Sequence, residues 1–81
     1  MENKIKQDIS IGENLKALRK QANLSQEEVA AKLELMGLSV SREMISQMEL
    51  GRYSIRVSIL AALKQIYGVD SFDAFFKGIN L

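Results

Sequence analysis

The sequence predicts a small all-α domain, a single compact unit of five short helices. First, the 81 residues include no proline and only five glycines, a composition that suits helices better than turn-rich β folds. Second, apolar residues recur at intervals of three and four, as on the buried face of a helix. Third, residues that commonly start or end helices separate these stretches, with Ser25 and Ser71 at starts and Gly37, Gly51 and Gly68 at ends.

The predicted helices follow a short polar segment. We expect residues 1–9 to form a loose N-terminal arm and residues 10–81 to form the folded domain. Ser10 is the expected N-cap of the first helix. The helices are expected at about residues 12–22, 26–36, 41–50, 57–67 and 72–77. These assignments leave no segment to form a strand.

The start of the second helix has the form of a capping box. In Ser25-Gln26-Glu27-Glu28, the Ser25 hydroxyl is placed to accept from the Glu28 amide, and the Glu28 carboxylate to reach back. Gly37 ends the helix in the left-handed conformation that glycine adopts without steric penalty. Its expected buried stripe is Val29, Ala30, Leu33 and Met36, with Leu35 on the far side.

The third helix, residues 41–50, separates into two chemically different faces when it is wound at about 100° per residue. Met44, Ile45 and Met48 share one arc, which predicts a buried face. The opposite arc offers an arginine, a carboxylate, a hydroxyl and an amide, the groups that read base edges. Its residues are Arg42, Glu43, Ser46, Gln47 and Leu50.

Composition excludes several classes of function. The chain has no cysteine and no histidine, so it lacks disulfides, thiolate metal sites, and the commonest metal ligand and general base. We therefore predict no enzyme activity, no metal site and no cofactor. No stretch is long and apolar enough to span a membrane and the N-terminus is no signal peptide, so the expected location is cytoplasmic.

The overall charge does not by itself indicate a nucleic-acid partner. Eleven basic and ten acidic residues give a formal net charge of +1, far from the strongly basic balance typical of such proteins. Between residues 41 and 56, three arginines stand against Glu43 and Glu49. A nucleic-acid function must therefore rest on where the charges lie.

The second and third predicted helices, joined by a short turn that contains glycine, form a helix-turn-helix arrangement. The sequence resembles the phage-repressor and Cro type of helix-turn-helix domain, the XRE family of bacterial regulators, over about residues 11–76. One departure is that residues 34–40 make the second helix or the turn longer than in most members. The matching motifs are Leu18-Arg19, Leu24-Ser25-Gln26-Glu27-Glu28-Val29-Ala30 and Ser41-Arg42-x-x-Ile45-Ser46-Gln47-x-Glu49-x-Gly51-Arg52.

The resemblance implies a five-helix, lambda-repressor-like fold and a sequence-specific regulator of transcription, a repressor, that binds double-stranded DNA. The helix at 41–50 would enter the major groove, and Arg19 and Glu49 would form an ion pair between the first and third helices. The implied base contacts are Arg42, Glu43, Ser46 and Gln47, and the implied backbone contacts are Gln26, Ser41, Arg52 and Tyr53.

The sequence leaves two alternatives open. The apolar residues Phe72, Phe75, Phe76, Ile79 and Leu81 either pack on the core or form a homodimer patch, and both can hold. A protein-interaction module, antitoxin-like or an adaptor with weak or lost DNA binding, is the alternative function. The low net charge and the outward positions of Glu43 and Leu50 favour that alternative.

The N-terminal arm also has a second interpretation. Lys4 and Lys6 would serve an arm that reaches along DNA rather than a loose one. Glu2 and Asp8 argue against it, because carboxylates are repelled by phosphates.

Overall fold

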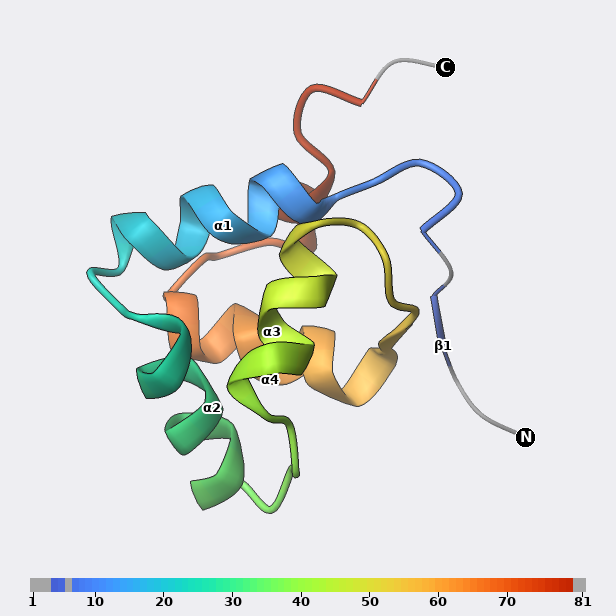
Figure 1. The fold of residues 1–81 in the computed structure, drawn as a ribbon. Coiled ribbons are helices and arrows are strands. Elements are labelled where there is room, and N and C mark those ends of the chain that lie inside the picture. The colour runs from blue at the N-terminus through green and yellow to red at the C-terminus, as the bar shows by residue number, and fades with distance from the viewer. Residues whose placement is uncertain (1–3, 6, 80–81) are drawn as a thin grey trace.

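The computed structural model describes residues 4–5 and 7–79, which form four α-helices, one 3-10 helix and a two-stranded sheet (Figure 1). Lys6 of the arm and Leu81 of the C-terminal cluster lie outside the described residues. The α-helices are α1 (Gly12–Gln21), α2 (Gln26–Leu35), α3 (Arg42–Glu49) and α4 (Val57–Tyr67). The 3-10 helix is η1 (Phe72–Phe76), and the strands are β1 (Lys4–Ile5) and β2 (Ile55–Arg56).

The prediction of five helices and no strand is therefore wrong in two places. The expected fifth helix is the single 3-10 helix η1, and the arm contributes a strand. β1 pairs with β2 in antiparallel register, with Lys4 opposite Arg56 and Ile5 opposite Ile55. Each strand has only two residues, too few to show a periodic pattern in the sequence.

Gln7 fastens the described part of the arm to the domain. Its side-chain Nε2 donates to the carbonyl oxygens of Tyr53 at 2.8 Å and Met48 at 3.3 Å. Its Oε1 accepts from the backbone N–H of Ile11 at 3.0 Å. These contacts join the chain before α1 to the last turn of α3 and to the segment after it, so Gln7 is held on the domain.

Capping side chains define where the helices begin. Both bonds of the capping box are present, with the Glu28 amide donating to Ser25 Oγ and the Ser25 amide donating to Glu28 Oε1. Ser41 is the N-cap of α3, and its Oγ accepts from the Met44 amide at 3.2 Å. At α1 the N-cap is Ile11 rather than Ser10, although Ser10 Oγ still accepts from the Gly12 amide.

A single apolar core joins the four α-helices to Ile55 and Phe75. α1 and α2 each pack against both α3 and α4, so α3 rests on α1 and α2 along one side. Val29, Leu33, Leu63 and Phe75 are almost completely buried.

Two methionines predicted to be buried are partly exposed instead. Met36 is the C-cap of α2, at the point where the chain leaves the helix for the turn. Met44 lies in the first turn of α3, beyond the part of that helix which the core covers, and is 37% exposed. Ile45 and Met48 on the same face are buried as predicted.

Glycine permits the close packing of α1 against α3. A side chain at Gly12 would overlap the carbonyl oxygen of Glu49, at the end of α3. The first turn of α1 therefore lies directly against the last turn of α3. This contact fixes the position of α3 beside α1.

Candidate nucleic-acid interface

The two faces of α3 differ in burial as well as in chemistry. Ile45, Met48 and Glu49 are buried against the other helices. On the outward side Arg42 and Glu43 are exposed, and Ser46 and Gln47 are half-buried. The four residues expected to contact bases thus lie on one helix, on the side away from the core.

An ion pair joins α1 to α3 beneath this outward face. Arg19 Nε donates to Glu49 Oε2 at 2.7 Å, and Arg19 Nη2 donates to Glu49 Oε1 at 3.1 Å. Both residues are only 8% exposed. The remaining Arg19 Nη1 donates to the carbonyl oxygen of Leu24, so the guanidinium also holds the turn that leads into α2. Such bidentate pairing fixes the relative orientation of the two elements.

The hydrogen bonds account for the direction in which the pKa of Arg19 moves. Donation to the Glu49 carboxylate raises the pKa of Arg19, burial opposes that rise, and the charge of Glu49 adds to it. The Arg19 guanidinium is therefore charged at neutral pH. Burial also raises the pKa of Tyr67, and the nearby charge of Glu49 raises it further. Tyr67 brings α4 into the surroundings of the pair.

Gln26 is a third member of this cluster. Its Nε2 donates to Glu49 Oε1 at 3.1 Å. The carboxylate of Glu49 thus receives donors from α1 and from the first residue of α2. We refer to Arg19, Gln26 and Glu49 as the bracing cluster. The position of Gln26 directly after the N-cap was visible in the sequence, but its direction toward α3 depends on how the helices cross.

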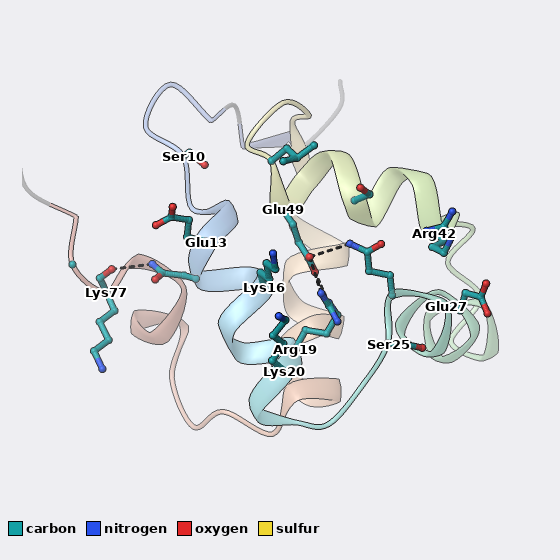
Figure 2. Close-up of a pocket in the computed structure, with 15 residues that line it drawn as sticks. Ser10, Glu13, Lys16, Arg19, Lys20, Ser25, Glu27, Arg42, Glu49 and Lys77 are labelled. Atoms are coloured by element: carbon teal, nitrogen blue, oxygen red, sulfur yellow. Dashed lines mark hydrogen bonds and ion pairs between the residues drawn. The ribbon is translucent and has the colours of Figure 1, made fainter.

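An open hollow lies between α1, the start of α2 and α3, and we call it the α1–α3 hollow (Figure 2). The bracing cluster forms part of its wall. Arg42, Ser46 and Leu50 reach it from α3. The other lining residues are Ser10, Glu13, Asn14, Lys16, Lys20, Ser25, Glu27, Lys77 and Gly78.

The expected backbone contacts lie at the two ends of α3 and at the start of α2. Ser41 is exposed at the beginning of α3, and Arg52 and Tyr53 are exposed just past its end. The backbone N–H of Arg52 donates to the carbonyl of Gln47 across Gly51, whose φ is +76°. This turn requires the left-handed conformation and sets where Arg52 leaves the helix.

A second, smaller hollow lies on the other flank of α3. Tyr53, Arg56 and Lys4 line it together with Met44 and Met48. Basic side chains are thus present on both sides of α3, from β1 and β2 on one flank and from α1 on the other.

The C-terminal aromatic residues separate into core and surface. Phe75 is completely buried, so of the two alternatives left open it packs on the core and cannot belong to a dimer patch. Phe72 and Phe76 are exposed, and Ile79 is partly buried against the core. Asn14 Nδ2 on α1 donates to the carbonyl oxygens of Phe75 and Lys77, which holds this segment on the domain.

Two further observations concern sites of other kinds. Among residues 4–5 and 7–79, no group of three or more acidic side chains is placed to hold a metal ion. No helix in that part of the chain has the length and apolarity that crossing a bilayer requires.

Comparison with known proteins identifies the family. A family model described as helix-turn-helix matches residues 15–73, from the middle of α1 to the beginning of η1. Searches of curated proteins and of solved structures found no match. The matched region contains the whole of α2, α3 and α4, together with the bracing cluster. The resemblance noted in the sequence is thereby confirmed, and the chain belongs to the XRE type of helix-turn-helix family, whose members are DNA-binding regulators.

Proposed function

We propose that this protein is a sequence-specific regulator, a repressor, that binds double-stranded DNA with α3 in the major groove. The observation that supports this most strongly is the bracing cluster. It holds the buried side of α3 to α1 and α2, while the polar side stays open to a partner. The major groove of B-DNA is wide enough for one α-helix.

The outward residues of α3 carry hydrogen-bonding groups that can recognise bases. Arg42 suits guanine, because its guanidinium can bridge O6 and N7. Gln47 suits adenine, and Glu43 suits cytosine, whose N4 amino group donates. Ser46 can donate or accept, so it fits either kind of edge.

The proposed backbone contacts would position α3 without reading sequence. Gln26 lies at the N-terminus of α2, where free amides favour an anion. Ser41 and Tyr53 offer hydroxyl groups, and Arg52 offers a guanidinium at the end of α3. Because these residues lie before and after α3, they would contact phosphates at both ends of the inserted helix.

A homodimer is part of the proposal. The exposed rings of Phe72 and Phe76 and the neighbouring Ile79 offer an apolar surface near the C-terminus. A symmetric dimer would place two copies of α3 about 34–36 Å apart, one turn of DNA. Two half-sites occupied together would block a promoter, which is the proposed mode of repression.

Selection of duplexes from a random pool tests the proposed function. The retained pool should converge on one sequence with two related halves, and affinity for it should fall steeply as salt rises. A promoter that overlaps the selected site should lose transcription when the protein is added. Failure to retain any duplex at about 50 mM salt would contradict DNA binding, since nonspecific attraction is already strong there.

A protein-interaction module is the second candidate. Leu50 is 59% exposed on the outward side of α3, and Leu35 is 89% exposed at the end of α2. Large apolar side chains at such positions favour a protein partner over a phosphate. Under this alternative, Leu50→Ser would abolish association with a partner protein, and the selection would retain no sequence.

A further inference from the structure

Lys16 and Lys20 of α1 belong neither to the bracing cluster nor to the DNA contacts proposed above. We propose that Lys16 and Lys20 bind the phosphodiester backbone of one DNA strand, which lies along the α1–α3 hollow while α3 occupies the major groove. This inference rests on the proposed function and adds a second, sequence-independent contact surface to it.

The two side chains are free to receive an anion. Lys16 and Lys20 are both exposed and both line the hollow, beside Arg19 and Glu49 (Figure 2). Neither has an ion-pair partner among the residues that the structure describes. Residues four apart on a helix are neighbours, and like charges at that spacing repel each other. An anion between them would remove this repulsion.

The charge of the hollow is more basic than that of the whole chain. Arg19 and Glu49 neutralise each other as a pair. The remaining lining residues are four cations, Lys16, Lys20, Arg42 and Lys77, and two acids, Glu13 and Glu27. The hollow thus has an excess of two positive charges, whereas the chain as a whole has a net charge of only +1.

Packing determines which part of DNA reaches the hollow. Gly12 lies against the end of α3, and the ion pair joins the same two helices further along α1. α1 is therefore fixed beside α3. Because the major groove admits one helix, α1 stays outside the groove when α3 is inside it. The rim of the groove is the phosphate backbone, so phosphates rather than base edges face Lys16 and Lys20.

The same hollow contains a base-reading candidate, and this argues for DNA over an acidic protein. Arg42 reaches it from α3 and Gln26 from the start of α2. A duplex that meets Arg42 brings its own phosphates toward α1, with no further partner required. Lys16 and Lys20 then act as point charges, which position the duplex without reading its sequence.

Salt dependence of binding tests the inference. The variants are Lys16→Gln, Lys20→Gln and the double variant, with Lys32→Gln as the matched control on α2, an exposed helical lysine outside the hollow. Lysine and glutamine have similar helix propensity, so the fold is preserved. Binding is measured between 50 and 200 mM salt on a duplex that the wild type selects.

Each hollow variant should reduce the slope of log K against log salt by about 0.9, and the double variant by about twice that. Between 50 and 200 mM salt, each variant should lose about three-fold less affinity than the wild type. The loss at fixed salt should be the same on selected and unrelated duplexes. Lys32→Gln should keep the wild-type slope.

Replacing single DNA phosphates with uncharged groups shows which phosphates Lys16 and Lys20 contact. Methylphosphonate groups placed singly along each strand should weaken the wild type at one or two positions that no longer matter to the double variant. If both hollow variants keep the wild-type slope while the wild type still binds DNA steeply, the inference is wrong and the proposed function stands. If the wild type binds no duplex at all, the proposed function itself is wrong.

Discussion

Glu49 is the residue at which three helices meet. It is nearly buried and accepts hydrogen bonds from Arg19 on α1 and Gln26 on α2. A buried charge is tolerated when donors replace the water it has lost. The cluster therefore fixes the orientation of α3 as long as all three side chains are present.

Arg19→Ala should destabilise the fold by about 3–5 kcal/mol, because it leaves the Glu49 carboxylate buried without its charge partner. Denaturant unfolding and the melting temperature measure the effect. A double variant, Arg19→Met with Glu49→Leu, is the control and should recover much of the stability, since it removes both charges. Melting of Arg19→Ala at the wild-type temperature would show that the pair does not have this structural role.

Arg42→Ala and Gln47→Ala should each weaken binding to the selected duplex by about 1–3 kcal/mol and relax preference at one base pair. Their melting temperatures should not change, because both side chains lie on the outward side of α3. Gln21→Ala, an exposed glutamine at the end of α1, is the matched control and should bind like the wild type. If Arg42→Ala and Gln47→Ala bind the duplex as tightly as Gln21→Ala, then α3 does not contact the bases.

The residue types in the sequence indicated much of the candidate site, but not the hydrogen bonds that join its members. The alternation of polar and apolar positions predicts which side of α3 faces outward, and that side is exposed or half-buried in the structure. The bond from Gln26 to Glu49 depends on the crossing of α2 and α3, which no local pattern records. The exposure of Met44 has the same origin, because helical spacing cannot show where the covering core ends.

Among the secondary-structure elements, α2 begins with a capping box, a local hydrogen-bonding motif that the sequence predicts and the structure contains. Hydrogen bonds from Ser25 to the carboxylate hold the pKa of Glu28 below its ordinary value, with the backbone N–H as the largest cause. Because the folded pKa is the lower one, this contribution is present above the ordinary pKa and is lost as pH falls through the folded value.

NMR titration of Glu28 should therefore give a pKa below the ordinary glutamate value of about 4.3. Glu28→Gln is the control, since it keeps an acceptor but cannot titrate, and it should remove this part of the acid sensitivity of unfolding. Titration of Glu28 at the ordinary value would mean that the box does not persist in solution.

Gly12→Ala tests the contact between α1 and α3. In an isolated helix this change would stabilise by up to about 1 kcal/mol, since alanine has the higher helix propensity. Here the new methyl group meets the carbonyl of Glu49, and such overpacking typically destabilises by about 1–3 kcal/mol. The sign of the change in unfolding free energy decides between the two, and a stabilised variant would contradict the close packing.

The elements that the sequence missed are the shortest ones. β1 and β2 have two residues each, so their pairing arises from contacts between distant parts of the chain. The hydrogen bonds of Gln7 hold these parts together. Phe72, Phe75 and Phe76 show the spacing of a helix, but the segment is a 3-10 turn of five residues. A short run leaves the choice of helix type to packing.

For the whole molecule, the proposed homodimer would form through the apolar surface near η1. The double variant Phe72→Ser with Phe76→Ser should sediment as a monomer and bind a two-half-site duplex no more tightly than a single half-site. Leu35→Ser is the control, because it removes a more exposed apolar side chain on α2. A double variant that still sediments as a dimer would place the dimer contact elsewhere.

Binding to duplexes that contain 7-deazapurines tests the central claim most directly. These bases lack N7, an acceptor that guanine and adenine present only in the major groove. If α3 reads the major groove, substitution throughout the selected site should weaken the wild type at least about ten-fold, and should weaken Arg42→Ala less. Unchanged binding of the wild type to the substituted duplex would contradict insertion of α3 into the major groove.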